Sequence, residues 1–339
     1  MNEATAPAER TEAPLAGLVS SAMLVHAVSA LLDLGVVDLL EDGPRELADL
    51  ARETGVPAER LTVVLRAVTA AGLVRQPAPG RHELTPAGNH LRRGDALGLR
   101  DLFRMCTHGD FFRAWSQLGA AVETGRSPFE LQTGRGLFPY LAGRPEESEL
   151  FRRAMNASAP ADVLLRAADL SGAATVADLG GGEGATLAAV LRARPGAAGV
   201  LFDLPEVVAG AGPLLRREGV ADRCTVVSGD LFEGVPAGAD VYVMARVLQN
   251  WGPEDAVRIL RNVRDAMPET GRLLVVGHLS DDERPDPFVE AIGLSMYVLY
   301  GAPPRTRADH EGLFARAGLA LHAVHPVPDG ASVMDVRRA

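Results

Sequence analysis

One stretch decides the fold of this chain: Asp178-Leu179-Gly180-Gly181-Gly182-Glu183-Gly184, directly after the apolar run Thr175-Val176-Ala177. Glycines at the end of a strand let the backbone approach a ligand, and a helix that begins there presents unpaired amides. The next apolar run ends at Asp203, 19 residues after Gly184. A carboxylate at that strand end is suited to hold the hydroxyls of a ribose. The spacing therefore predicts a nucleotide-type cofactor at the glycine loop.

The residues around this loop favour S-adenosylmethionine (SAM) over a dinucleotide. The Gly-x-Gly-x-x-Ala pattern that starts at Gly180 also fits a dinucleotide fingerprint, so the glycines alone do not decide. However, Asp178 stands two residues before the first glycine, and a Gly-Asp pair at residues 229–230 follows the third apolar run. Leu231-Phe232 then places apolar side chains where an adenine ring would lie. SAM is the predicted cofactor.

The C-terminal half alternates short apolar runs with helical stretches. This alternation predicts an α/β fold with a doubly wound, mostly parallel sheet in a Rossmann-like domain over residues 171–339. The strands are expected at residues 175–177, 199–202, 224–227, 241–244, 273–276 and about 321–327.

Residues 14–94 have the order of a winged helix-turn-helix. Residues 46–52 predict one short helix and residues 58–71 a second, and the runs 73–75 and 82–84 predict a small hairpin. Such a module either binds DNA or serves as a structural, dimerising domain. The second helix offers few charges for phosphate and base contacts, so the sequence favours dimerisation over nucleic-acid binding.

Three further segments complete the organisation. Residues 1–13, rich in Ala, Glu, Thr and Pro, predict a disordered leader, and residues 95–170 predict a middle helical region. Residues 15–32 contain no Asp, Glu or Arg and resemble a targeting segment. The charged residues before them are Glu3, Glu9 and Glu12 against Arg10 alone, and the stretch carries serines and a histidine, which disfavours a secretory signal or a membrane span. We expect a buried helix of a soluble, cytoplasmic protein.

Composition excludes several chemistries. All 34 basic residues are arginine, so the chain has no lysine for a Schiff base, a P-loop or a lysine base. The net charge of −10 argues against a nucleic-acid footprint. Cys106 and Cys224 share no metal-ligand spacing, and the histidines are scattered, so no metal is expected.

The sequence resembles the small-molecule O-methyltransferases that include plant caffeate-type enzymes and bacterial antibiotic-tailoring enzymes. Four blocks carry the resemblance, which extends over essentially the whole chain: residues 176–182, 202–205, 229–232 and 247–251. The resemblance implies a homodimer with intertwined N-terminal domains. The cofactor residues that the motif and the blocks indicate are Asp178, Gly180, Gly182, Asp203, Leu204, Asp230, Leu231 and Trp251. The resemblance also implies that Met155 lies close to the cofactor.

The chain departs from the family at the base that deprotonates the acceptor hydroxyl. The family's histidine position holds Gln249, and its two glutamate positions hold Gly277 and Pro304. A glutamine amide cannot take a proton near neutral pH. Positioning alone can still contribute about 7 kcal/mol or more in favourable cases, so transfer to an acidic phenol without a base is physically reasonable.

The resemblance also indicates an acceptor pocket, formed partly by residues 95–170. Gln249 would orient the acceptor, and His108 is a second catalytic candidate; His278 is expected to turn away by strand alternation. The pocket candidates are Met105, Phe112, Asn250, Met296 and Tyr300.

These observations predict an O-methyltransferase that acts on an aromatic or polycyclic natural product. One alternative is a SAM-binding enzyme of this fold that catalyses hydroxylation or a pericyclic step. A more remote alternative is a winged-helix regulator that senses a ligand.

Overall fold

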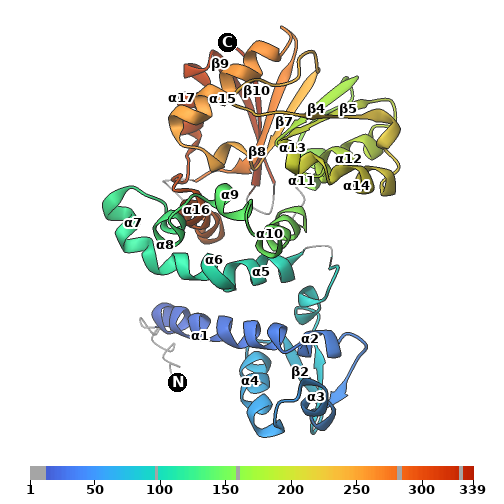
Figure 1. Ribbon diagram of the computed structural model, residues 1–339, viewed down its shortest axis with the longest axis vertical. Helices are drawn as coiled ribbons and strands as arrows, with labels where there is room; N and C mark the ends of the chain where they lie inside the picture. Colours follow the sequence, from blue (N-terminus) through green and yellow to red (C-terminus); the bar gives the residue numbers. More distant parts are fainter. Residues whose placement is uncertain (1–12, 96–97, 158–160, 281–284, 328–330) are drawn as a thin grey trace, which may run out of the picture. The chain divides into compact units, whose positions relative to one another are not determined.

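The computed structural model describes residues 13–95, 98–157, 161–280, 285–327 and 331–339 (Figure 1). The chain divides into two compact units. Unit 1 comprises Met1–Phe112 and Pro145–Ser158, and unit 2 comprises Arg113–Arg144 and Ala159–Ala339. The expected middle region, residues 95–170, is therefore not a body of its own, because its helices pack in part on each unit. The expected leader lies outside the described residues except for Ala13, which already begins a helix.

Unit 1 contains the predicted winged-helix order. Two helices precede a hairpin whose second strand also pairs with β1, giving a three-stranded sheet in the order β1-β3-β2. The helices bury leucines and a valine at helical spacing, including Leu50, Leu61, Leu65 and Val68. The elements are α2 Val36–Leu39, β1 Arg45–Glu46, α3 Leu47–Thr54, α4 Ala58–Ala70, β2 Val74–Ala78, β3 Arg81–Leu84 and η1 Gly88–Leu91.

The apolar helix α1, Ala13–Asp33, differs from the expectation of a buried helix. Only its second half is buried, at Val28, Leu31 and Leu32. Leu18 and Met23 in the first half are 69% and 68% exposed. By length and composition Pro14–Asp33 could cross a membrane, a property that core helices and signal sequences share. The prediction was wrong for the first half because its apolar residues have no partner surface within the described part of unit 1.

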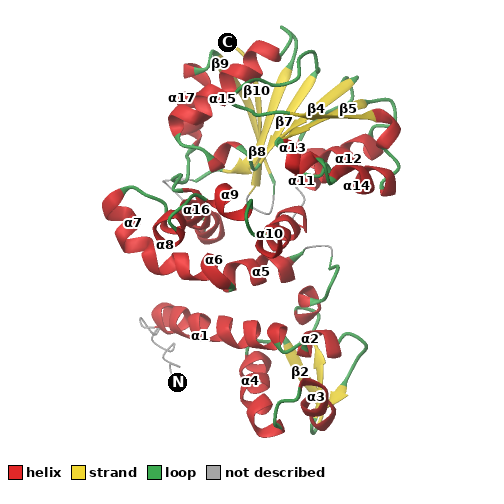
Figure 2. Cartoon of the chain, in the orientation of Figure 1, coloured by secondary structure: helices red, strands yellow, loops and turns green. Residues whose placement is uncertain are grey.

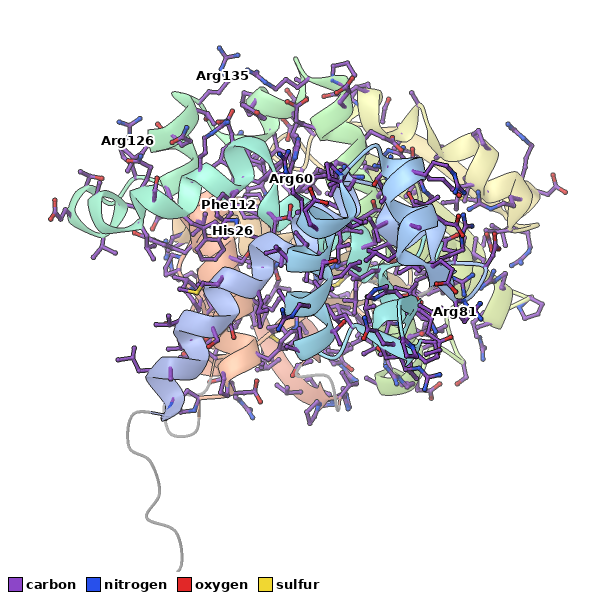
Figure 3. The ribbon with its side chains drawn as sticks, turned by 90° about the horizontal axis from the view of Figure 1, so that it is seen from below. His26, Arg60, Arg81, Phe112, Arg126 and Arg135 are labelled. Carbon is purple, nitrogen blue, oxygen red and sulfur yellow. The ribbon has the colours of Figure 1, made fainter. Side chains whose placement is uncertain are left out.

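The remaining helices of unit 1 are tied together by charges. They are α5 Leu99–Thr107, the start of α6 Gly109–Ala114, and α10 Pro145–Ala157. The buried Arg100 donates to Asp38 and to the carbonyl of Leu91, which anchors α5 to the winged-helix core. On the same unit, His26 of α1 meets the ring of Phe112 edge to face, with centroids 5.3 Å apart (Figure 3).

Unit 2 is built on a seven-stranded sheet in the order β6-β5-β4-β7-β8-β10-β9. Strands β4 to β8 are parallel, and β10 pairs antiparallel with both β8 and β9. All six predicted strands are confirmed, whereas the sequence analysis missed β10. The strands are β4 Thr175–Leu179, β5 Ala198–Asp203, β6 Cys224–Ser228, β7 Val241–Ala245, β8 Arg272–His278, β9 Leu319–Pro326 and β10 Ala331–Arg338.

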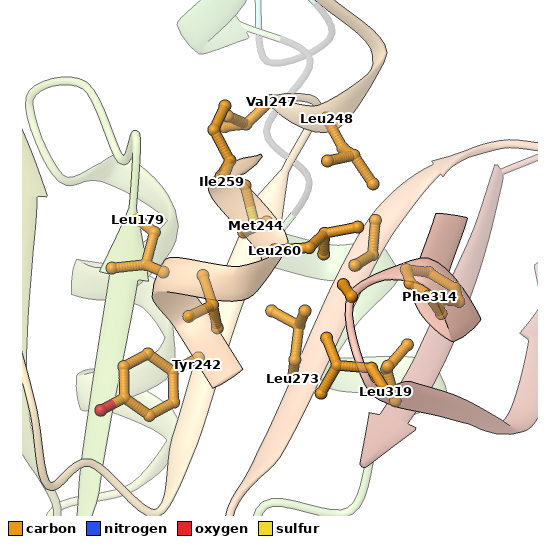
Figure 4. Close-up of a cluster of buried hydrophobic side chains, with 14 of the residues drawn as sticks. Leu179, Tyr242, Met244, Val247, Leu248, Ile259, Leu260, Leu273, Phe314 and Leu319 are labelled. Carbon is orange, nitrogen blue, oxygen red and sulfur yellow. The ribbon is translucent and has the colours of Figure 1, made fainter. Parts of the chain in front are cut away.

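Helices cover both faces of this sheet (Figure 2). On one face, apolar residues of α11 Ala161–Ala167, α12 Ala185–Ala193 and α14 Ala211–Arg217 pack on the strands. On the other face, α15 Pro253–Ala266 and α17 Arg307–Arg316 contribute Ile259, Leu260 and Phe314 to a cluster around Tyr242 and Met244 (Figure 4). Burial on both faces explains why the central strands β4, β7 and β8 read as continuous apolar runs, whereas the edge strand β6 is partly exposed.

Several short helices and one longer helix connect the main elements of unit 2. The long helix among them, α16 Pro287–Tyr300, begins at Asp286, whose side chain accepts from two backbone amides, and ends at Gly301 with φ +72°. The Tyr297 hydroxyl donates to the carbonyl of Ala121, which ties α16 to α7. The others are η2 Trp115–Gln117, α7 Leu118–Thr124, α8 Pro128–Thr133, α9 Leu137–Leu141, α13 Pro205–Val208, η3 Ala221–Arg223 and η4 Leu248–Asn250.

Candidate functional site

The glycine loop lies between β4 and α12 and has a backbone that only glycine adopts readily. Gly180, Gly182 and Gly184 have φ of +67°, +63° and +90°. At Gly181 a Cβ would come within 2.6 Å of Leu201 Cδ1 and 2.7 Å of Asp178 Cγ. At Gly182, by contrast, a Cβ would meet nothing within 4 Å. The loop is therefore packed tightly against the sheet on one side and open on the other, as a ligand-binding loop must be.

Asp203 ends β5 and is held against this loop. Its Oδ2 accepts from the amide of Gly182 at 2.8 Å, and its Oδ1 accepts from the amide of Leu204 at 2.7 Å. Burial raises the pKa of the Asp203 carboxyl, while the two amides favour its charged form. A carboxylate offers about four lone-pair sites, so two amides leave capacity for the hydroxyls of a ribose.

The Asp178 side chain lies deeper in the same site. It is 1% exposed, and its Oδ2 has no hydrogen-bond partner among the described residues. Burial and the neighbouring Asp203 raise the pKa of Asp178 to about 7. A buried carboxyl with an unused oxygen at the base of a glycine loop is a functional-site signal, because such groups are rare in a packed core.

Asp230 and an aromatic wall complete the cofactor side. Asp230 follows β6, and its Oδ1 accepts from the amide of Phe232 at 2.9 Å. Trp251 meets the ring of Phe232 edge to face at 4.8 Å and stacks on Phe138 at 6.1 Å. The arrangement places an apolar, aromatic surface next to the Asp230 carboxylate, and such a surface fits a purine ring.

The residues present therefore fit SAM. Asp178 with its unpartnered oxygen, the open face of Gly182, and the carboxylate of Asp203 would hold its amino-acid and ribose parts, and Asp230 with Trp251 would flank its adenine. Leu204 and Leu231 lie beside these carboxylates in the chain, and the backbone of Leu231 is fixed by a 2.7 Å hydrogen bond from Asn262.

A pocket lies beside this site, at the ends of β8 and α16. Its polar lining consists of Gln249, His278, Ser280, Arg305 and His310, and its apolar lining includes Val289, Ile292, Met296, Ala302, Pro303 and Pro304. Gln249 Nε2 lies 3.0 Å from Met296 Sδ, so two of the predicted acceptor-side residues are brought together. No carboxylate lies among the described residues that line the pocket.

The two glutamate positions of the resemblance contribute to the shape of this pocket. A Cβ on Gly277 would have only Gln249 Oε1, at 3.4 Å, within 4 Å, so the space is open. Pro304 instead packs against α16, because a Cβ on Gly293 would lie 2.6 Å from Pro304 Cγ. The position of Gly277 is therefore open space, and the position of Pro304 is filled by a ring that cannot act as an acid or a base.

Arg305 fixes the loop that carries Gln249 and Trp251. Its guanidinium donates to the carbonyl of Leu248 at 2.9 Å and to the carbonyl of Trp251. The side chain is buried, which lowers the pKa of the guanidinium. Two charge-assisted hydrogen bonds from one buried cation hold both ends of η4 in place.

Arg246 and Tyr300 meet at the end of β7. Arg246 is the one non-glycine residue with positive φ, +59°, in the described part of the chain. Burial lowers the pKa of its guanidinium and raises the pKa of the Tyr300 hydroxyl, while each group partly offsets the shift of the other. Backbone strain of this kind persists where surrounding structure enforces it, often at functional sites.

Unit 2 brings most of the predicted site residues together at or beside the carboxyl ends of its strands. These residues are Asp178, Gly180, Gly182, Asp203, Leu204, Asp230, Leu231, Gln249, Asn250, Trp251, Met296 and Tyr300. The remaining four candidates belong to unit 1, where Met105 is buried and His108 and Phe112 are exposed. Met155 lies on α10 of the same unit. Their roles stay predictions.

Sequence reasoning missed three residues of this region. His278 was expected to turn away by strand alternation, but it lines the pocket with Gln249 from the last position of β8, at the strand end where the pocket lies. His310 and Arg305 were not assigned a role. A usable signal was the capping box at Thr306, since a helix that starts there turns His310 to the same side as Phe314.

Comparison with known proteins agrees with this geometry. Residues 115–320 match an O-methyltransferase domain, and residues 16–94 match an O-methyltransferase dimerisation domain. The chain is similar to the phenazine O-methyltransferase PhzM of Lysobacter antibioticus, with 36% identity over 323 residues and 94% of each chain covered. It is also similar to the mitomycin biosynthesis 6-O-methyltransferase of Streptomyces lavendulae, with 35% identity over 348 residues covering 100% of this chain and 98% of that one.

A solved structure extends the likeness to the cofactor. NcsB1, an O-methyltransferase from neocarzinostatin biosynthesis in complex with SAM and 2-hydroxy-5-methyl naphthoic acid, is 28% identical, with a TM-score of 0.76 and coverage of 93% of this chain and 96% of that one. Fold and site together define a SAM-dependent methyltransferase. The chain belongs to the O-methyltransferase family that these relatives represent, which confirms the predicted fold class, cofactor and enzyme class.

Proposed function

We propose that this enzyme methylates a hydroxyl group of an aromatic or polycyclic natural product. Two of its relatives are named for phenazine and mitomycin, and a third is bound to a naphthoic acid. The pocket beside Gln249 has an apolar lining that includes Val289 and Met296 and also exposes polar groups, so it suits a polar substituent of such a ring.

The single observation that carries the mechanism is the open space at Gly277 beside Gln249. No described residue supplies a carboxylate there, and the Gln249 amide cannot accept a proton near neutral pH. When bound, SAM supplies a strongly electrophilic methyl group. The acceptor enters the site as a phenolate, because an acidic phenol has already lost its proton to solvent, and the chain's own residues then orient the acceptor oxygen and exclude water.

Incubation with methyl-labelled SAM and phenolic acceptors tests this function. Label in the product supports methyl transfer. A product without label would instead support the alternative, a SAM-binding enzyme of this fold that catalyses hydroxylation or a pericyclic step.

Gln249→Ala is expected to lower kcat/KM by about tenfold or less. The side chain orients the acceptor by a hydrogen bond, whereas loss of a general base costs roughly 10²–10⁴-fold. Steady-state kinetics with a phenolic acceptor measures the change, with the affinity for S-adenosylhomocysteine (SAH) as a control for folding. A loss near 10⁴-fold would contradict simple orientation.

We propose a homodimer in which a second copy covers the first half of α1. The support is the match of residues 16–94 to a dimerisation domain and the exposure of Leu15, Leu18 and Met23 on α1. Exposed apolar clusters of this kind mark interfaces.

Met23→Glu is expected to shift the protein from dimer to monomer, because the introduced carboxylate would be buried without a partner. Light scattering after size exclusion measures the mass. Val122→Glu, at a position 71% exposed on α7, is the matched control and should remain a dimer. A dimeric Met23→Glu protein would mean that another surface carries the association.

We also propose that the enzyme is cytoplasmic and that it binds neither a nucleic acid nor a membrane. On α4, the predicted recognition helix, the cations are Arg60 (Figure 3) and Arg66, next to Glu59. Two arginines beside an acid are few for phosphate contacts.

A further inference from the structure

His310 lines the acceptor-side pocket without a role in the proposed methyl transfer. It lies on α17, one turn after the cap at Thr306, and shares the pocket with Gln249 and His278. The pocket has a volume of about 40 Å³, enough for a polar ring substituent or a water molecule. An occupant of that size would lie next to His310, which is one of the lining residues.

The imidazole of His310 is buried but incompletely satisfied. The residue is 5% exposed, and its Nδ1 has no hydrogen-bond partner among the described residues. One contact holds the ring in place, a tilted packing on Phe314 with centroids 5.8 Å apart. A buried polar atom without a partner destabilises the protein, so such an atom in a pocket is typical of a site that a ligand completes.

The surroundings keep this ring neutral. Burial and the positive charge of Arg305 lower the pKa of His310 to about 4, against the opposing effect of Asp309. A neutral imidazole has one donor and one acceptor nitrogen, so it can hydrogen-bond a carbonyl, a hydroxyl or a ring nitrogen. Arg305, whose guanidinium is bonded to the carbonyls of Leu248 and Trp251, lines the same pocket as His310 and Gln249.

We infer that His310 is a specificity-determining residue, which hydrogen-bonds through Nδ1 to a second polar atom of the aromatic acceptor, distinct from the hydroxyl that is methylated. This inference rests on the proposed function, because it assigns the acceptor to the pocket of Gln249. It narrows the substrate class to rings that carry at least two oxygen or nitrogen substituents. A buried site built for a hydrogen bond discriminates strongly against an analogue that lacks the partner.

The test compares two acceptors in four proteins. The acceptors are 1,4-dihydroxy-2-naphthoic acid and 1-naphthol, which lacks the second polar groups. The proteins are the wild type, His310→Phe, which keeps a ring without nitrogen, His310→Asn, which keeps a polar atom near Nδ1, and His310→Gln, which displaces that atom. The ratio of kcat/KM for the two acceptors is measured with methyl-labelled SAM, and SAH affinity is measured by calorimetry.

We expect His310→Phe to lower this ratio by about 10- to 100-fold, with SAH affinity unchanged. His310→Asn should restore most of the ratio and His310→Gln should not. In the wild-type SAH complex, 1,4-dihydroxy-2-naphthoic acid should shift the ¹⁵N resonance of His310 Nδ1, and 1-naphthol should leave it in place.

Three results would overturn the inference. An unchanged ratio in His310→Phe would mean that His310 bonds only water, and an equal loss for both acceptors together with weaker SAH binding would mean a packing role. A wild-type enzyme that binds SAH but neither binds nor methylates either acceptor would show that the proposed acceptor class is wrong, and the inference would fall with it. If the acceptors are methylated but the kcat/KM ratio is unchanged in His310→Phe, the role of His310 is overturned and the proposed function stands.

Discussion

Gly181→Ala is expected to weaken SAM binding on the order of 100-fold, a loss of about 3 kcal/mol. The new Cβ would lie 2.6 Å from Leu201 Cδ1 and 2.7 Å from Asp178 Cγ, both buried beneath the loop. The backbone must therefore move away from the sheet. That movement breaks the alignment of the Gly182 amide with Asp203.

Calorimetric titration of SAM and SAH measures this effect directly. Gly196→Ala provides the matched control, since a Cβ there meets nothing within 4 Å. Gly196→Ala should bind both ligands as the wild type does. Normal affinity in Gly181→Ala would show that the glycine loop is not the cofactor site.

Arg305→Met is expected to lower kcat/KM by about 100-fold or more and the free energy of unfolding by about 2–4 kcal/mol. The change leaves the carbonyls of Leu248 and Trp251 without their donor in a buried region. The loop that holds Gln249 and Trp251 then loses its anchor at both ends. Because Trp251 moves with it, SAM affinity should fall together with turnover.

Chemical denaturation, kinetics and tryptophan fluorescence read out these three consequences. Arg307→Met is the control, because Arg307 is exposed and pairs with Glu311 one turn along α17. An exposed pair of this type contributes less than about 1 kcal/mol. If Arg305→Met kept the wild-type activity, the hydrogen bonds of Arg305 would not be needed to position the loop that carries Gln249 and Trp251.

Much of the fold was predictable because its signals are contiguous in the chain. The central parallel strands of unit 2, β4, β7 and β8, are buried on both faces, so each reads as one apolar run. Strand β10 escaped prediction because it buries Ser332 and Asp335 among its apolar residues, which resembles a loop in sequence. The first half of α1 was wrongly expected to be buried, since hydropathy does not say whether the same chain or a partner covers a helix.

The cofactor side of the site was predictable for the same reason. Glycines and carboxylates at strand ends follow from local sequence, as Gly180, Asp203 and Asp230 illustrate. The acceptor side was less accessible, because Arg305 and His310 reach Gln249 only through tertiary packing over more than 50 residues of chain. His278 shows the limit of strand periodicity at the last position of a strand.

The position of β10 has a consequence for how the enzyme is assembled. This strand lies between β8 and β9 and pairs Ala331 with His278, so the last described segment of the chain sets the end of the strand that reaches the acceptor pocket. The glycine loop, by contrast, depends on β4 and β5, which come much earlier. During synthesis the strands of the glycine loop emerge long before β10, so the acceptor pocket can be completed only after β10 has joined β8. Because Arg305 anchors Trp251 on the cofactor side, full SAM affinity also waits for this later part of the chain.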